Sequence, residues 1–226
     1  MIRPAALLAL LPLLVAGCGR GAPAEAPAKT ANSSAAVETA GEAAKPAPLP
    51  DVVRVRLETE AGPIVVALDA KRARITTANF VRYVEEGRFD GTTFYRASLS
   101  KGAPKGELRG FIQGGIRRDY RRTLPPITHE PTSATGIRHE AGTISMARAE
   151  EGAGAMGNFF ITTSPMRSMD AKEGKPGYAA FGRVEEGMDA VRRILAAPTV
   201  ADAGRGAMRG QMLAQPVRIV QARRVD

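Results

Sequence analysis

Residues 78–96 read ANFVRYVEEGRFDGTTFYR, and two periodicities meet within this stretch. Its first half places apolar side chains on one face of a helix, at Phe80, Val81 and Val84. Gly87 is the residue type that most often ends a helix, and Asp90-Gly91 is a turn signal. The run that follows is β-branched and aromatic, which is typical of a strand. The stretch therefore predicts a helix, a turn and a strand in succession.

The flanking sequence extends this pattern in both directions. Upstream, residues 52–59 alternate apolar and charged side chains as a half-buried strand does, residues 63–68 suggest the returning strand, and Thr76 or Thr77 could cap the helix. Downstream, the short runs TTFYRAS, GFIQGGI, GTISMAR and NFFITTS are separated by loops rich in Gly, Pro and charge. A second helix is predicted at roughly 187–196 and a last strand at 215–225. Many short strands separated by turns predict an antiparallel sandwich or a closed barrel.

The N-terminus has the features of an export signal. Arg3 precedes an apolar run at residues 5–16, which is too short to span a membrane. The run ends in Val15-Ala16-Gly17-Cys18, which resembles a bacterial lipobox with a lipid-modified cysteine; the alternative is an ordinary secretory signal that happens to contain a cysteine. Cys18 is the only cysteine, so no internal disulfide can form. We expect residues 1–17 to be a signal peptide and Cys18 to be the lipidation site, with the protein exported and held at the periplasmic face of the outer membrane.

The remaining chain divides by composition. Residues 18–50 are mostly Ala, Pro, Gly, Glu, Lys, Ser and Thr, and such a segment cannot bury enough apolar surface to offset its ordering entropy. We therefore predict a disordered tether at 18–50 and one folded domain at 51–226. The formal net charge of the chain is +9. We interpret the basic runs at 117–122 and 222–224 as solvated surface and expect no nucleic-acid partner.

Seven segments from 52 to 225 resemble those of the cyclophilins and occur in the order typical of that family. They are the opening hairpin, the 78–96 block, FIQGG, GTISMAR, NFFITTS, the GYAAFGRVEEGMDAV block and the closing strand. The resemblance implies a mainly β fold, a closed eight-stranded antiparallel barrel capped by two α-helices. It also implies a peptidyl-prolyl cis-trans isomerase that needs no cofactor and no metal. Its partners would be proline-containing segments of exported proteins, bound by a monomer.

The resemblance also assigns roles to individual residues. Arg96 matches the family's catalytic arginine, and Gln113 matches the glutamine that binds the substrate carbonyl and helps to orient the arginine. The positions that match the substrate groove and the proline pocket are Tyr95, Phe111, Ala147, Asn158, Phe160, Met169 and Tyr178. Alternation along the strand places Phe159 on the opposite face from Phe160, in the core.

Several residues depart from the family pattern. Tyr95 replaces a common histidine, Asn158 a glutamine, and Ser168 a large aromatic residue, which puts high-affinity binding of cyclosporin in doubt. Residues 98–110 are longer than the usual link, and this loop could gate the groove or be a passive insertion. These departures leave open a non-catalytic proline-peptide-binding chaperone on the same fold, and composition alone would also allow a structural envelope lipoprotein.

Other catalytic arrangements find no support in the sequence. His129 and His139 each precede a glutamate, and we expect structural or surface roles for both rather than a metal site. No Ser/His/Asp arrangement and no phosphate-binding loop is apparent.

Overall fold

The structure, a computed structural model, describes residues 48–117, 119–148 and 156–226. The predicted signal peptide, Cys18 and all but the end of the tether lie outside these residues. The described part contains, in order, β1 (Val52–Thr59), β2 (Ile64–Asp69), α1 (Arg74–Glu85), β3 (Thr93–Leu99), β4 (Gly110–Gly115), η1 (Tyr120–Arg122), α2 (Thr132–Thr135), β5 (Thr143–Met146), β6 (Asn158–Thr162), η2 (Arg167–Met169), β7 (Ala179–Glu186), α3 (Met188–Ala196), β8 (Thr199–Val200), η3 (Gly206–Met208) and β9 (Met212–Val225).

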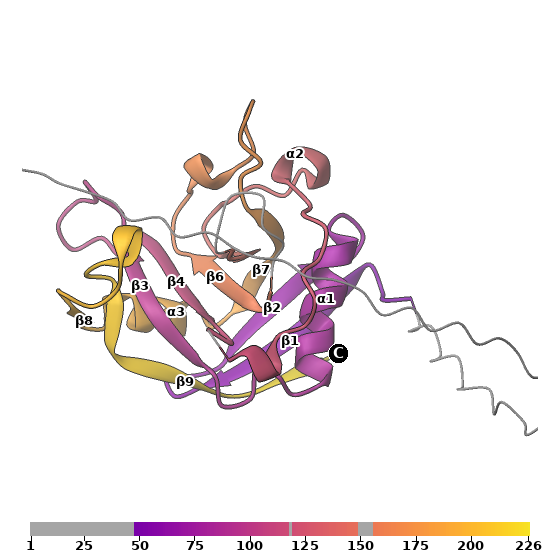
Figure 1. The fold of residues 1–226 in the computed structure, drawn as a ribbon, viewed down its shortest axis with the longest axis horizontal. Helices are drawn as coiled ribbons and strands as arrows, with labels where there is room; N and C mark the ends of the chain where they lie inside the picture. Colours follow the sequence, from indigo (N-terminus) through magenta and orange to yellow (C-terminus); the bar gives the residue numbers. More distant parts are fainter. Residues whose placement is uncertain (1–47, 118, 149–155) are drawn as a thin grey trace, which may run out of the picture. The chain divides into compact units, whose positions relative to one another are not determined.

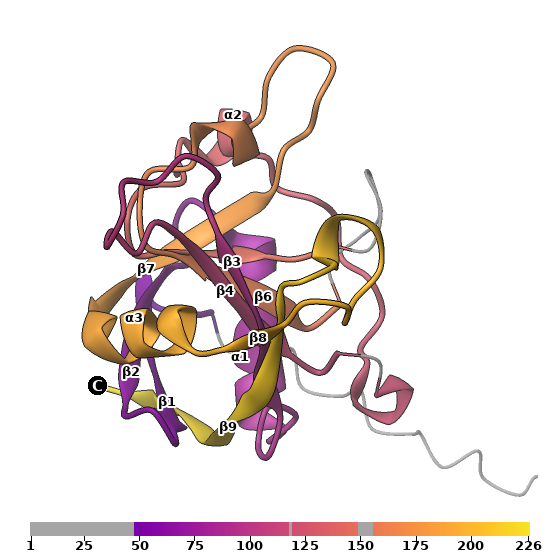
Figure 2. The ribbon, with the colours of Figure 1, turned by 90° about the vertical axis from the view of Figure 1, so that its left-hand side faces the viewer.

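The strands form a single antiparallel sheet that closes on itself (Figures 1 and 2). The order is β1-β2-β7-β5-β6-β4-β3-β9, and β1 pairs again with β9, from Arg54↔Val225 to Thr59↔Ile219. Closure removes the free edges that an open sheet would expose. The predicted eight-stranded barrel is confirmed, with the two-residue β8 as an additional strand that pairs with β9.

Two helices cover the barrel, as predicted, and a third is added. α1 packs on β1, β2, β7 and β9, whereas α3 packs on β2, β3 and β4. The ring of Phe80 on α1 lies 4.9 Å from Phe89 and 5.3 Å from both Phe159 and Phe181, measured between centroids. The predicted apolar face of α1 is therefore the face that enters the core. The single-turn helix α2 was not predicted, and no helix in the described ranges is long and apolar enough to cross a membrane.

The predicted cap of α1 is wrong. The helix begins at Arg74, and both Thr76 and Thr77 are buried inside it. The free N–H groups of its first turn are instead satisfied by Glu130, whose carboxylate accepts from Ile75 N at 3.1 Å and from Thr76 N at 2.7 Å.

A β-bulge on β3 shapes the outer face of the barrel. Phe94 pairs with Gly114 and Arg96 with Gln113, so Tyr95 is an extra residue on this strand. Phe94 and Ala97 both belong to the core although they lie three residues apart, which strict alternation would forbid. The bulge thus places Tyr95 and Arg96 together on the outer face.

Candidate active site

A chain of hydrogen bonds crosses the outer face from β3 to β6. Arg96 Nη1 donates to Gln113 Oε1 at 2.8 Å, and Gln113 Nε2 donates to the Tyr95 hydroxyl at 2.8 Å. That hydroxyl donates to Asn158 Oδ1 at 3.3 Å. Because the guanidinium can only donate, it fixes which end of the Gln113 amide faces it.

The chain ends at Arg117, whose backbone has φ 53. Asn158 Oδ1 accepts from Arg117 N at 2.8 Å, and its Nδ2 donates to Arg117 O at 3.2 Å. Left-handed backbone is uncommon outside glycine, so Asn158 stabilises an unfavourable turn beside the site. Arg117 also places its guanidinium carbon 5.5 Å from the centroid of Tyr95.

Beside this chain lies an apolar cluster that is separate from the barrel core. Phe111, Ala147 and Phe160 form its buried part, and Met166, Met169 and Tyr178 pack against them. Phe160 is 3% exposed, and its ring lies 5.4 Å from those of Phe111 and Tyr178. The cluster supplies an apolar, partly open surface of the kind that binds an uncharged ring.

Arg96 joins the polar chain to the apolar cluster. Its guanidinium carbon lies 4.9 Å from the centroid of Phe111, and Gln113 stands directly across the ladder from both Arg96 and Phe160. Burial lowers the pKa of Arg96, and an arginine remains charged at neutral pH despite such a shift. Burial raises the pKa of Tyr95, while its hydrogen bond with Gln113 opposes that rise. The site therefore holds a fixed positive charge beside an apolar surface.

A second polar chain supports the apolar cluster from beneath. His139 Nδ1 lies 2.7 Å from Asp170 Oδ1, and His139 Nε2 lies 2.9 Å from the hydroxyl of Ser145. The imidazole is fully buried and stacks on Phe160 with centroids 5.7 Å apart and planes 9° apart. Burial lowers the pKa of His139 against the opposing effect of Asp170, so we assign a neutral ring that donates from Nδ1 and accepts at Nε2.

The structure therefore contains a Ser/His/Asp arrangement that was not apparent in the sequence. His139 and Ser145 lie six residues apart and Asp170 lies 31 residues from His139, so no local motif marks the three. Ser145 is fully buried and pairs with Phe160 on the neighbouring strand β6, and this burial keeps its hydroxyl from any substrate carbonyl. The arrangement is a support for the pocket, in agreement with the structural role expected for His139.

Comparisons with known proteins place the chain in a family. The family model described as "Cyclophilin type peptidyl-prolyl cis-trans isomerase/CLD" matches residues 54–224. The chain belongs to the cyclophilins. It is 37% identical over 144 residues to "Peptidyl-prolyl cis-trans isomerase A" of Dickeya dadantii, which covers 62% of this chain and 70% of the relative. It is 36% identical over 155 residues to "Peptidyl-prolyl cis-trans isomerase cyp18" of Streptomyces antibioticus, which covers 66% and 87%.

A solved structure agrees with the fold. A cyclophilin type peptidyl-prolyl cis-trans isomerase of Cryptosporidium parvum superposes with a TM-score of 0.59 at 18% identity, covering 77% of this chain and 98% of that one. Together, the family match and the named relatives show that this cyclophilin is a peptidyl-prolyl cis-trans isomerase.

The structure brings together every site residue that the sequence predicted within the cyclophilin domain. Arg96, Gln113, Tyr95 and Asn158 form the hydrogen-bonded chain, and the other five lie in or against the apolar cluster. Tyr95 is only 5% exposed, so its hydroxyl serves mainly to position Gln113 and Asn158. The sequence analysis missed Met166, although an apolar residue only three positions before Met169 could have suggested this role. It also missed Gln211, which no motif marks.

The long loop is attached to the cyclophilin barrel at its base. It joins β3 to β4, and Ser100 N donates to Arg109 O at 2.8 Å. Thr163 Oγ1 donates to Leu108 O at 2.8 Å, and Leu108 packs against the core.

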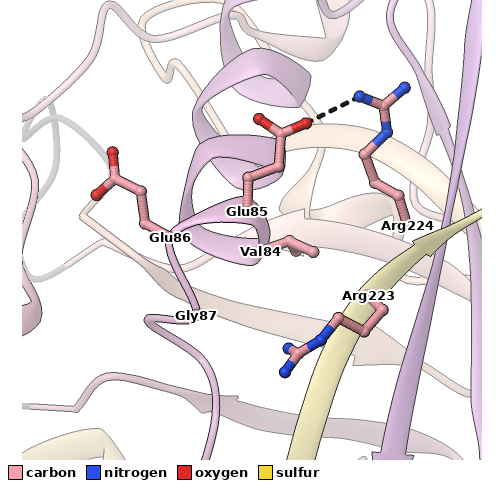
Figure 3. Close-up of a pocket in the computed structure, with 6 residues that line it drawn as sticks. All are labelled: Val84, Glu85, Glu86, Gly87, Arg223 and Arg224. Atoms are coloured by element: carbon pink, nitrogen blue, oxygen red, sulfur yellow. Dashed lines mark hydrogen bonds and ion pairs between the residues drawn. The ribbon is translucent and has the colours of Figure 1, made fainter.

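A separate hollow of about 440 Å³ lies between the end of α1 and the end of β9 (Figure 3). Its lining charges are paired, with Glu85 and Arg224 at 2.8 Å and Arg223 and Asp90 at 2.8 Å. It contains no residue of the predicted cyclophilin site. Among the described residues, no group of three or more His, Cys, Asp or Glu side chains is placed to hold a metal ion.

Proposed function

We propose that this isomerase acts on X–Pro bonds of exported or envelope proteins, with Arg96 as its catalytic residue and lipid at Cys18 as its anchor. Amide resonance sets the rotational barrier at about 18–20 kcal/mol, so unaided isomerisation takes tens to hundreds of seconds. No covalent intermediate is needed. A catalyst must hold the proline and favour the twisted state in which the amide nitrogen leaves conjugation.

The observation that carries the proposal is the placement of Arg96 against the partly exposed apolar cluster of Phe111, Phe160 and Met169. A proline ring seated on Phe160, between Phe111 and Met169, would bring its nitrogen toward the guanidinium. Donation to that nitrogen stabilises its localised lone pair, which exists only in the twisted state, and therefore accelerates rotation. A charged donor held by Gln113 before substrate arrives needs no reorganisation during the reaction.

Gln113 has a second role in this scheme. Its amide oxygen is engaged by Arg96 and its nitrogen by Tyr95, so its orientation is fixed. The oxygen retains a second lone pair and the nitrogen a second N–H. We assign that remaining N–H to the substrate carbonyl before the proline. Ala147 and Asn158 would flank the residues N-terminal to it.

The envelope context is supported by the N-terminal sequence. The apolar run at residues 5–16 and the lipobox-like ending at Cys18 would export the chain and attach it to lipid. Residues 18–50 would then give the isomerase reach above the membrane. Newly exported chains with slow X–Pro bonds are the clients that this arrangement favours.

The test is the rate of cis-to-trans exchange in a proline tetrapeptide, measured by NMR with detergent-solubilised full-length protein. We expect the rate to rise in proportion to enzyme concentration. If the folded protein binds the peptide and leaves the rate unchanged, a peptide-binding chaperone would replace the catalytic proposal.

A further inference from the structure

Gln211 contacts the proposed catalytic arginine more extensively than Gln113 does. Its Oε1 accepts from Arg96 Nε at 2.9 Å and from Arg96 Nη2 at 2.7 Å. The two residues are 115 positions apart in sequence. Only the oxygen of an amide can accept, so the guanidinium fixes the orientation of this amide as well.

The backbone of Gln211 is held by two hydrogen bonds. Its carbonyl accepts from Ala97 N at 2.9 Å, and its own N–H donates to Met208 O at 3.1 Å. The next residue, Met212, pairs with both Val200 on β8 and Arg96 on β3. Figures 1 and 2 both show the start of β9 lying beside β3 and β8. Gln211 is therefore presented by an ordered part of the barrel.

An irregularity in the sheet brings Gln211 to this place. Phe94 pairs with Val217 and Arg96 with Met212, so one residue of β3 faces four residues of β9, 213–216. Beyond this irregularity Met212 pairs with Arg96, and the residue before it, Gln211, lies beside the guanidinium. The bulge at Tyr95 and this longer one on β9 occur at the same point of the ladder.

The hydrogen-bond arrangement suggests what Gln211 does. A guanidinium has five N–H donors, and one edge of Arg96, made of Nε and Nη2, is taken by Gln211. Gln113 takes one donor of Nη1. Within the described residues this leaves one N–H on each terminal nitrogen. Because Gln211 is neutral, it restrains the guanidinium without cancelling its charge.

We propose that Gln211 is a positioning residue that holds Arg96 with its two remaining terminal N–H groups directed to the substrate. This inference rests on the proposed catalytic role of Arg96. It predicts that loss of the Gln211 oxygen lowers the rate of isomerisation and leaves peptide affinity nearly unchanged, because proline binding belongs to the apolar cluster.

The experiment is a double-mutant cycle on the full-length protein in detergent, with exchange rate and peptide affinity both read by NMR. Gln211→Leu removes the acceptor at similar volume, and we expect a loss of about 3- to 30-fold in catalysed exchange. In an Arg96→Ala background the same change should cost less than about twofold, because the residue it positions is absent. Gln215→Leu changes an exposed glutamine on β9, four residues further along the chain; it is the matched control and should change neither quantity.

Gln211→Glu is a second variant that keeps both hydrogen bonds and adds a negative charge. We expect it to fold and still to lose rate, because a carboxylate offsets the charge of Arg96. A Gln211→Leu enzyme with wild-type rate would overturn the inference, as would an equal loss with and without Arg96. If Arg96→Ala itself leaves the rate unchanged, the proposed role of Arg96 fails first and the positioning role fails with it.

Discussion

Asp170 supports the pocket through His139, and its removal should destabilise the fold measurably. Its carboxylate accepts two hydrogen bonds from His139, from the backbone N at 2.9 Å and from Nδ1 at 2.7 Å. Asp170→Ala leaves both donors without a partner beside a fully buried imidazole. Each unsatisfied buried donor costs about 1–3 kcal/mol. Since the side chain of Asp170 is 13% exposed, water can replace part of the loss, and we expect a decrease of about 2–4 kcal/mol in the free energy of unfolding.

Urea unfolding at pH 7.5 measures this change directly. The matched control is Asp189→Ala on α3, whose side chain is 84% exposed and pairs with the exposed Arg192. Exposed pairs contribute little, so the control should lie within about 0.5 kcal/mol of wild type. Asp170→Ala should also weaken proline-peptide binding, because the imidazole that stacks on Phe160 loses its anchor. A variant as stable as the Asp189 control would refute the role given to this chain.

Three further predictions concern pH, anchoring and the long loop. Burial lowers the pKa of His139 in the folded protein. The contribution of the neutral imidazole to the free energy of unfolding is therefore complete above the unfolded pKa of about 6.5, and it declines as pH falls toward the folded pKa by at most about 1.4 kcal/mol per pH unit. A free energy of unfolding in urea that is constant from pH 7.5 to 5 would contradict this. Cys18→Ser should release the protein from the membrane fraction or block its maturation, and unchanged fractionation and gel mobility would argue against lipidation. Deletion of 101–107 should leave the melting temperature nearly unchanged, because Leu108 and its hydrogen bond from Thr163 remain. A changed kcat/KM in that variant would indicate that the loop gates the site, and an unchanged kcat/KM would indicate a passive insertion.

Local patterns made much of the fold predictable. β1 spans Val52–Thr59 as its alternation predicted, and α3 begins one residue after the predicted start because Gly187 occupies the N-cap. The apolar face of α1 was visible because Phe80, Val81 and Val84 share it. These features depend on residues within a few positions of each other, which is the range that periodicity can reach.

What the sequence could not predict depends on contacts between distant segments. Glu130 caps α1 from 54 residues away, a position no local capping rule would examine. The bulge at Tyr95 lies where β3 changes register with both β4 and β9, and the shift against β9 also brings Gln211 beside Arg96. The site residues were assigned by family order, since spacing alone would leave Arg96 as an ordinary strand arginine.

The most direct test of the account is kcat/KM for a proline tetrapeptide with wild type, Arg96→Ala and Arg96→Lys, with thermal melting as the control. Removal of one well-placed charged donor should lower kcat/KM by ten- to a thousandfold, or about 1.4–4 kcal/mol, with peptide affinity largely kept. Arg96→Lys should recover little, because an ammonium lacks the planar fork that Gln113 and Gln211 hold. An Arg96→Ala protein that melts like wild type and isomerises the peptide at the wild-type rate would contradict the account.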